Sequence, residues 1–476
     1  MATTVIRNAD WVVSYEGGGH RYDRGDVAFT NDKLVHVGGA FVGAADREID
    51  GRGFMVMPGL VNIHSHPMSE PLNKGWNDEI GSPKLYNSSL YEIMPLLRPD
   101  ADGMRTSATV ALCEALLSGV TTLVDLSVAY DGWIDLMAAS GMRSVLAPMY
   151  RSARWYTDNG YAVKYEWDEA AGRKAMEVAL GIVASATKHP SKRLSGMIAP
   201  SQIDTCSPEL IKDSYREAQR LKIPFQIHAA QSTVEFHEIT RRHGMTPIEW
   251  LGSLGVLGPS SIIGHGIFLD HHAHAHWPRR DDLGSIIESG TTIAHCPTVF
   301  IRRGITMQTV GGYIRRGTRI GIGTDTYPHN MLEEMRNALY ASRIVAGTPF
   351  DLRTSDIFDA ATLGGAAALG REDIGRLAKG AKADLVMIDT TCPSMRPLRD
   401  PLRSLVYVAA DRAVRHVFVD GNQVVADGRV TTLDLAAASE ALQETQQRLL
   451  PQVRQLDWAK RSHRDISPMV YDGSQD

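Results

Sequence analysis

The chain has 476 residues, of which 43% are hydrophobic and 22% charged, a composition typical of a globular protein with a full core and more than one domain. Its net charge of −5 gives no indication of attraction to nucleic acid or to a membrane surface. The N-terminus lacks a basic segment followed by an apolar core, no apolar run has the length of a membrane span, and the four cysteines form no C-x-x-C pair. We therefore expect a cytoplasmic protein in a reduced compartment, with neither a nucleic-acid nor a membrane partner.

Residues 3–53 contain short β-like runs at 11–15, 26–29 and 34–37, separated by turns, and no long helix. From residue 54 to about 345, eight strand-like runs follow one another and end near His66, near Asp125, between Arg143 and Met149, near Gln202, and at His228, His265, His295 and Asp325. Amphipathic helices are predicted between most of them, at 101–118, 169–187, 208–221, 233–243 and 281–289. This alternation predicts an α/β protein with a (β/α)₈ TIM barrel. An open doubly wound sheet is the alternative, but no G-x-G-x-x-G follows the first strand.

Short β-like runs return at residues 376–430, and a polar helical pattern follows them. We interpret the two ends of the chain as one small β-sandwich that flanks the barrel. The expected division is 1–56 and 368–430 for the composite β-sandwich, 57–367 for the metal-binding barrel, and 431–476 for a C-terminal helical tail. We expect the tail to be a solvated helix on the outside of the molecule.

The first barrel strand ends in a His-x-His pair, His64 and His66. Residues two apart on a strand project to the same side, so the two imidazoles converge. Such a pair is a weak signal alone, but three later strand ends supply His228, His265 and Asp325. Because catalytic residues of barrels lie at the C-terminal ends of the strands, these side chains are candidates to bind a metal or to carry protons.

These motifs, in this order, resemble the metal-dependent amidohydrolase superfamily, in the branch that contains cytosine deaminases and triazine chlorohydrolases. The matching segments are residues 57–66, His228, His265, 323–325 and 375–386. The resemblance implies that His64, His66, His228 and Asp325 bind the metal, and that His265 and Asp325 are catalytic. Strand four, at 199–204, lacks the Lys or Glu that bridges two ions in dinuclear members. We therefore expect one divalent ion, with zinc preferred over iron or cobalt.

Deaminases of this branch carry a Glu three residues after the strand-five histidine, where this chain has Gln231. An amide can hydrogen-bond but cannot deliver a proton at neutral pH. Glu235 is either a substitute acid or an ordinary helix residue. The sequence therefore favours cleavage of a C–N bond in an amide, urea or carbamate by a metal-bound hydroxide, and the pattern also resembles phenylurea and thiocarbamate (molinate) hydrolases. The alternatives are an aminopurine or aminopyrimidine deaminase, a triazine-type chlorohydrolase, and a catalytically silent scaffold.

Polar and aromatic residues near other strand ends are candidates to contact a small-molecule substrate, since aromatic walls suit a planar or apolar ligand. The expected substrate-binding residues are Gln231, His295, Trp76, Tyr327 and His329. A histidine-rich segment at 270–277 is interpreted as a loop over the barrel mouth, with a second metal site as the alternative. We also expect a homo-oligomer.

Overall fold

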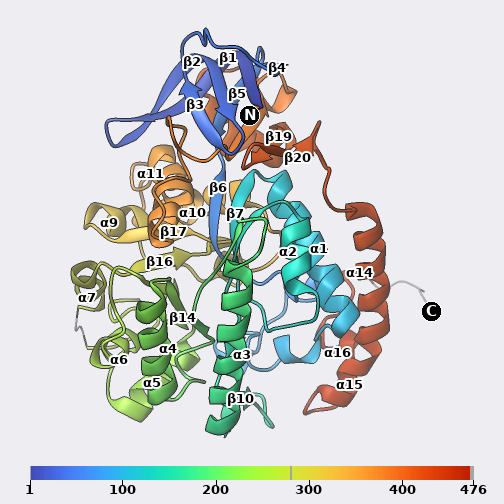
Figure 1. Cartoon of the computed structure of the whole chain (residues 1–476). Helices are drawn as coiled ribbons and strands as arrows, with labels where there is room; N and C mark the ends of the chain where they lie inside the picture. The colour runs from blue at the N-terminus through green and yellow to red at the C-terminus, as the bar shows by residue number, and fades with distance from the viewer. Residues whose placement is uncertain (1, 279–280, 472–476) are drawn as a thin grey trace.

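The computed structural model describes residues 2–278 and 281–471. Strands from both ends of the chain form a single nine-stranded sheet at one end of the molecule, at the top of Figure 1. Its order is β21-β20-β19-β18-β5-β1-β2-β3, with β4 beside β1. The strands are β1 (Thr3–Glu16), β2 (Gly19–Thr30), β3 (Lys33–Val37), β4 (Arg47–Asp50), β5 (Phe54–Pro58), β18 (Leu385–Asp389), β19 (Val414–Val419), β20 (Asn422–Ala426) and β21 (Arg429–Val430).

The two ends of the chain meet in the middle of this sheet, where β5 pairs in parallel with β1 and antiparallel with β18. One face buries an apolar cluster that includes Ile6, Phe29 and Phe418. The composite of both ends predicted from the sequence is thus one continuous sheet. The boundaries between this sheet and the barrel, at residues 56 and 368, remain a prediction.

Parallel strands form the centre of the molecule in two four-stranded sheets, β12-β8-β7-β6 and β14-β15-β16-β17, with β9 and β13 as a separate short pair. The strands are β6 (Leu60–Ser65), β7 (Val120–Asp125), β8 (Arg143–Leu146), β9 (Met149–Tyr150), β12 (Leu194–Gly196), β13 (Ala199–Pro200), β14 (Phe225–Ala229), β15 (Ser261–His265), β16 (Thr292–His295) and β17 (Arg319–Ile322). Parallel bridges between Ile198 and Phe225 and between Ser65 and Asp325 connect the two sheets. All eight predicted runs are strands, although their pairing is interrupted and does not form one continuous ladder.

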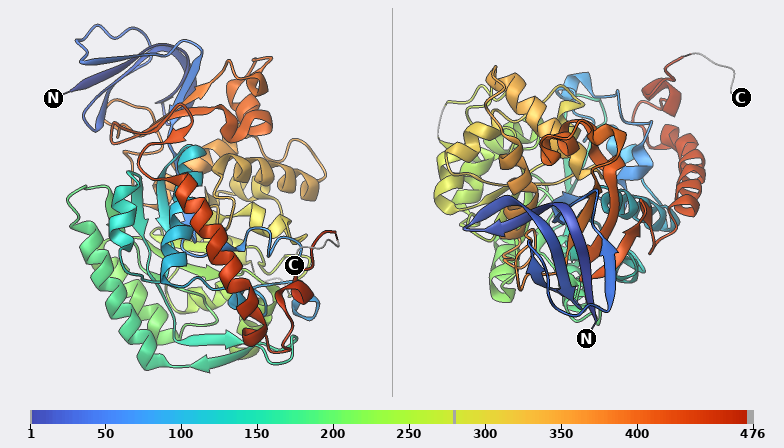
Figure 2. Two further views of the ribbon diagram at one scale, coloured as in Figure 1. Left: turned by 90° about the vertical axis from the view of Figure 1, so that its right-hand side faces the viewer. Right: turned by 90° about the horizontal axis from the view of Figure 1, so that it is seen from above.

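Helices lie outside the parallel strands (Figures 1 and 2), so these strands are buried on both faces. The longer helices are α1 (Ala101–Leu117), α2 (Trp133–Ala139), α3 (Glu169–Thr187), α4 (Pro208–Leu221), α5 (Thr233–His243), α6 (Pro247–Ser253), α7 (Asp282–Ser289), α10 (Met331–Ala346) and α14 (Leu435–Leu449). Several begin where a polar side chain accepts a hydrogen bond from a backbone N–H of the first turn, as Asp168, Ser207 and Ser232 do for α3, α4 and α5. These caps explain why the predicted helices agree with the structure to within a residue.

Shorter elements include the hairpin of β10 (Ala153–Tyr156) and β11 (Lys164–Trp167), which the sequence analysis missed. The shorter α-helices are α8 (Pro297–Ile301), α9 (Val310–Arg315), α11 (Thr354–Asp359), α12 (Gly365–Ala368), α13 (Pro401–Ser404), α15 (Val453–Leu456) and α16 (His463–Ile466). The C-terminal helix α14 runs along the outside of the molecule (Figure 2) and packs on α1. It buries Leu442 and Leu449 in a cluster with Trp76. The helix is therefore not fully solvated, because one face contributes to the core.

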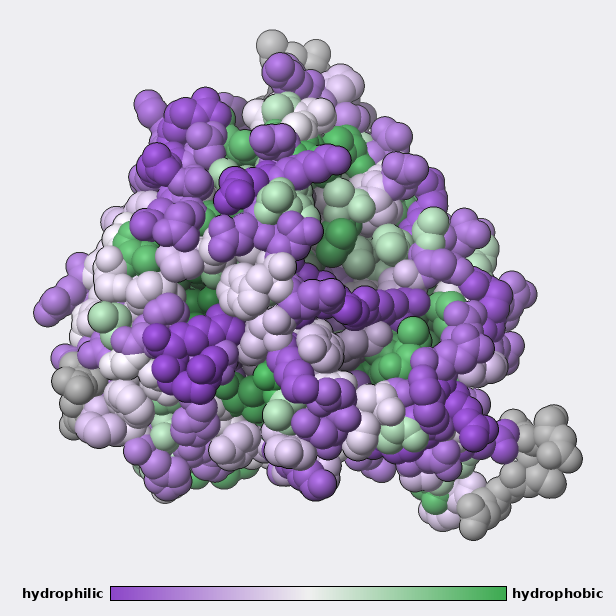
Figure 3. Space-filling model, turned by 90° about the horizontal axis from the view of Figure 1, so that it is seen from below, coloured by the Kyte–Doolittle hydropathy of each residue, from purple (hydrophilic) through white to green (hydrophobic). Residues whose placement is uncertain are grey.

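On the face opposite the terminal sheet, hydrophobic side chains occur in small groups among hydrophilic ones (Figure 3). Within the described residues, every helix is too short or too polar to cross a bilayer.

Candidate active site

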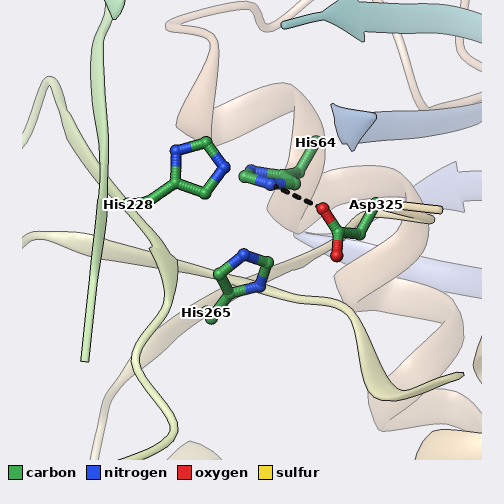
Figure 4. A group of neighbouring side chains, drawn as sticks. All are labelled: His64, His228, His265 and Asp325. Carbon is green, nitrogen blue, oxygen red and sulfur yellow. Dashed lines mark ion pairs between the residues drawn. The ribbon is translucent and has the colours of Figure 1, made fainter. Parts of the chain in front are cut away.

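Four potential metal ligands from four strand ends converge on one point (Figure 4). They are His64 of β6, His228 of β14, His265 of β15 and Asp325, which follows β17, and their ligand atoms all lie within 4.8 Å of one another. His66 joins them, because its Nε2 lies 3.2 Å from His228 Nε2 and 3.2 Å from Asp325 Oδ1. The Asp325 N–H donates to the His64 carbonyl at 2.8 Å, so the first and last parallel strands bring these residues together.

The orientation of three imidazoles is set by hydrogen bonds on the side of the ring that faces away from this point. His64, His66 and His228 each direct Nδ1 at a carbonyl-type oxygen. The acceptors are, in the same order, Gln226 Oε1, the Leu126 carbonyl at 2.7 Å and the Ser201 carbonyl at 2.6 Å. A ring that donates through Nδ1 presents the Nε2 lone pair to a metal. The donor set and its orientation therefore fit a divalent ion.

The protonation states also suit metal binding. Burial lowers the pKa of His265 to about 3, and burial with the neighbouring imidazoles lowers the pKa of His228 well below its ordinary value. Burial alone would raise the pKa of Asp325, but His265 and the hydrogen bonds from His64 and His66 outweigh it and hold that pKa well below the ordinary value. His228 is thus neutral and Asp325 ionised at neutral pH, as metal ligands must be, and His265 is neutral as well. Burial would lower the pKa of His66, but the hydrogen bond and charge of Asp325 outweigh it and raise that pKa, so a metal at this site must displace a proton from His66.

The backbone at the site adopts conformations that side chains other than glycine rarely take. Ala230, His265 and Asp325 have φ of 55°, 85° and 56°. Residues in this region cost about 1–3 kcal/mol each and cluster at functional sites. Two glycines leave room for the His64 imidazole and backbone: a Cβ on Gly264 would lie 2.8 Å from His64 Cε1, and a Cβ on Gly323 would lie 2.5 Å from His64 Cβ.

A cavity of about 430 Å³ opens over this cluster and is lined by His66, His228, His265 and Asp325. Its apolar wall is formed by Leu90, Met94, Phe268, Val299, Phe300 and Ile305. Among the described residues that line it, the carboxylates are Asp325 and Glu70. The cavity is the size of a small-molecule site with a few polar groups on an apolar wall.

Gln231 lies where the resemblance places a Glu, in the wall of the cavity. Its side chain is 9% exposed, and its Nε2 has no hydrogen-bond partner. Glu235, the possible substitute, lies behind this wall with no exposed surface and accepts a hydrogen bond from the Ala230 N–H at 2.6 Å. It does not line the cavity.

The other predicted substrate contacts lie outside this cavity wall. Trp76 packs in the cluster under α14, Tyr327 lies under the guanidinium of Arg302, and His295 and His329 are 1% and 0% exposed. Their contact with a substrate remains a prediction.

Two histidines of the 270–277 segment are engaged within the protein. His271 contacts Asp270 Oδ1 at 3.0 Å and Tyr313 Oη at 2.8 Å, and His272 Nε2 contacts the Thr306 carbonyl at 3.0 Å. His274 lines the cavity instead. These contacts favour a structural loop at the cavity over a second metal site.

Glu70, Phe300 and Arg303 are wall residues that the sequence analysis did not find. Glu70 follows the His-x-His pair by four residues, and Phe300 and Arg303 follow the seventh strand. Their positions after strand ends were the one feature of the sequence that could have indicated them, but no spacing rule distinguishes them from their neighbours.

The sequence profile of the amidohydrolase family matches residues 55–424 of the chain. The chain belongs to the amidohydrolase family. A 5-methylthioadenosine/S-adenosylhomocysteine deaminase of Pelotomaculum thermopropionicum is 28% identical to this amidohydrolase over 458 residues, which cover 94% of this chain and 99% of the relative. An adenosine deaminase structure from Xanthomonas campestris with bound zinc has a TM-score of 0.79 at 24% identity and covers 94% of this chain and 98% of its own.

Atrazine chlorohydrolase from Arthrobacter aurescens TC1, complexed with zinc, has a TM-score of 0.75 at 21% identity and covers 93% of this chain and 100% of its own. At these identities the two solved structures show a shared fold. This amidohydrolase is therefore a metal-dependent hydrolase that acts on carbon–nitrogen bonds. The resemblance to the deaminase and triazine hydrolase branch is confirmed. The closer resemblance to phenylurea and thiocarbamate hydrolases finds no support in these relatives.

Proposed function

We propose that this amidohydrolase is a zinc-dependent deaminase of adenosine-type nucleosides. The observation that carries the proposal is the convergence of His64, His228, His265 and Asp325 within 4.8 Å at a cavity of small-molecule size. The choice of substrate class is supported by a relative, named as a 5-methylthioadenosine/S-adenosylhomocysteine deaminase, that matches this chain over nearly its whole length. This proposal replaces our first interpretation of the sequence, which ranked amide, urea or carbamate cleavage above deamination.

His64, His66, His228 and Asp325 would hold a single ion, and zinc suits three imidazoles and one carboxylate. A bound ion of this kind lowers the pKa of a coordinated water from about 16 toward 7. Asp325 accepts the proton of the attacking water and passes it to the leaving amine. His265, whose ring contacts Phe300, orients the attacking oxygen and stabilises the negative charge that forms on it.

The architecture that we infer for this site is a closed (β/α)₈ barrel over residues 57–367, flanked by the sheet of both chain ends and by the helical tail. The bridge between Ser65 and Asp325, beside the two four-stranded sheets, supports this closure. A homo-oligomer remains a prediction.

The test is a product screen by mass spectrometry with zinc-loaded protein. Adenosine, 5′-deoxyadenosine and 5′-methylthioadenosine should each be offered, and at least one should release ammonia and yield the 6-oxo product. Elemental analysis should find close to one zinc per chain. Absence of ammonia with all three nucleosides would contradict the proposal.

Gln231 favours a second candidate, hydrolysis of an amide, urea or carbamate, because that reaction requires no proton on a ring nitrogen. The same screen separates the two functions when N-substituted ureas, carbamates and amides are included. Release of a substituted amine without ammonia from any nucleoside would support the second candidate.

A further inference from the structure

Removal of a ring amine by water requires a second acid besides the group that serves the leaving amine. The ring nitrogen next to the reacting carbon must gain a proton as the oxygen adds, because otherwise negative charge accumulates on the ring. Gln231 occupies the expected place of this acid and cannot supply the proton. A deaminase built on this chain must therefore take the proton from another residue of the cavity.

Glu235 is the nearest carboxyl in sequence, but its location excludes direct contact with a substrate. It has no exposed surface, it does not line the cavity, and one of its oxygens already accepts the Ala230 N–H. Gln231, in contrast, lines the cavity.

Glu70, unlike Glu235, lies in the cavity wall. It lines the cavity with His66, Gln231 and Asp325, and it is 5% exposed. Its Oε2 has no hydrogen-bond partner, and its carboxyl forms no ion pair with the described residues. Apart from Asp325, it is the one carboxyl in the cavity wall among the described residues.

Arg303 lines the same cavity and its charge acts on Glu70, but its guanidinium hydrogen-bonds to other groups. Its guanidinium donates to the Ser89 hydroxyl at 2.7 Å and to the Val299 carbonyl at 2.8 Å. An unpaired buried acceptor is destabilising, and more so if it is charged. A ligand that hydrogen-bonds to Glu70 removes this cost.

Backbone contacts hold Glu70 in place. It begins the short helix η1 (Glu70–Asn73), and its N–H donates to the His66 carbonyl at 3.2 Å. Gln446 of α14 donates to the Leu72 carbonyl of the same turn at 2.6 Å. The carboxyl is therefore presented to the cavity by a turn fixed at both ends.

We propose that Glu70 is the catalytic carboxyl that exchanges a proton with the substrate's ring nitrogen, in the role that Gln231 cannot perform. The proposal rests on the deaminase function proposed above. Glu70 gives its proton to the ring nitrogen as the oxygen adds to the neighbouring carbon. The bond to the amine then breaks, and ammonia leaves with the proton that Asp325 carried. The hydroxyl proton of the adduct returns to Glu70, so a lactam forms and no co-reactant is consumed.

The kinetic test compares zinc-loaded wild type with Glu70→Gln, Gln231→Glu and the double variant Glu70→Gln/Gln231→Glu. Glu70→Gln should lower kcat by about 10²-fold or more with zinc content unchanged, the scale for a general acid. The double variant should recover at least about tenfold of this loss, because a carboxyl again lines the cavity, now at residue 231. A merely structural role of Glu70 would show no such rescue.

The matched control is Glu92→Gln. Glu92 is also a buried carboxylate, 7% exposed, but it is paired with Trp458 and Arg461 outside this cavity. Its amide variant should lose stability and keep turnover within about threefold, since no cavity group changes.

A binding measurement gives a readout that is independent of turnover. The lactam product and its ring N-methyl derivative are titrated into wild type and into Glu70→Met, which removes the carboxyl at similar volume. Wild type should prefer the N–H lactam by about tenfold, and Glu70→Met should lose most of this preference, because the ring N–H then has no carboxyl oxygen to donate to.

Three outcomes would overturn the inference: Glu70→Gln that keeps turnover within about threefold, Glu70→Gln that loses its zinc, or an unchanged lactam preference in Glu70→Met. If wild type itself releases no ammonia from any nucleoside, the proposed function fails first. The two failures are therefore distinguishable.

Discussion

Single residues next to the His64 imidazole decide whether a metal can bind. Gly264 is part of β15 and lies against this ring, whose Nδ1 contacts Gln226 Oε1. In Gly264→Ala the new methyl group would lie 2.8 Å from Cε1 and must displace the ring. We expect zinc affinity to fall at least about tenfold, the lower end for a disturbed ligand orientation. Competition with a chromogenic chelator measures this change.

The control for this substitution is Gly181→Ala, at an exposed position of α3 where a Cβ meets nothing within 4 Å. Alanine is a better helix former than glycine by about 1 kcal/mol. The control should therefore gain stability and keep its zinc affinity. Equal zinc affinity in the two variants would refute the steric argument.

At the scale of elements, α14 supports the turn that carries Glu70. Gln446 Nε2 donates to the carbonyls of Leu72 at 2.6 Å and Lys74 at 2.8 Å. Gln446→Leu leaves both carbonyls without this donor, so we expect a loss of about 1–3 kcal/mol in the free energy of unfolding. Urea denaturation measures the loss, and amide exchange should accelerate in residues 70–76.

Gln452 provides a comparison on the same tail, because its Nε2 donates to the exposed Arg448 carbonyl. Gln452→Leu should change stability by less than about 0.5 kcal/mol, as is usual for surface positions. If both variants behaved alike, α14 would not support the turn as we argue.

At the scale of the whole molecule, a buried ion-pair cluster joins the parallel strands to the terminal sheet. Arg143 of β8 is 3% exposed and donates from Nε to Asp384 at 2.9 Å and from Nη2 to Asp420 at 2.5 Å. Arg143→Met leaves the buried Asp384 without its cation and Asp420 with Lys382 alone. The loss should cost about 3–5 kcal/mol in the free energy of unfolding. Chemical denaturation checks the value.

Arg52→Met is the matched control, because the Arg52 pair with Asp50 is exposed. Its removal should cost less than about 1 kcal/mol. A loss below 1 kcal/mol in Arg143→Met would mean that this cluster does not join the two parts.

His20 of β2 makes a second contact of the terminal sheet, with Thr362 and Phe358, sensitive to pH. Its Nε2 contacts Thr362 Oγ1 at 3.1 Å, its ring lies 5.2 Å from that of Phe358, and burial lowers its pKa to about 4. Between pH 6.5 and 4 the unfolded chain binds the additional proton, so the free energy of unfolding falls as pH decreases. The effect at pH 5 is about 2 kcal/mol.

His20→Gln keeps a hydrogen-bonding group and cannot titrate. Its free energy of unfolding relative to wild type should therefore increase by about this amount between pH 7 and pH 5. Parallel pH curves for the two proteins would show that His20 does not cause the change.

The sequence by itself determined the local elements and the metal motif. Short apolar runs, six of which end at His or Asp, predicted all eight parallel strand positions, and capping side chains such as Ser207 and Ser232 marked the helix starts. These signals are readable because alternation along a strand and capping of a helix depend on neighbours in sequence. The His-x-His pair and Asp325 were found for the same reason.

Tertiary structure decided what depends on residues far apart in the chain. Three features arise from contacts that no local pattern encodes. They are the pairing of β5 with β18, the hydrogen bond between Gln226 and His64, and the position of Glu70 in the same cavity wall as Asp325. The proposed function likewise depends on both sequence and tertiary structure. Gln231, considered in sequence, argued against deamination, whereas the folded cavity contains a second carboxyl from another loop. Proton transfer depends on which groups share a cavity, and only the folded chain brings those groups together.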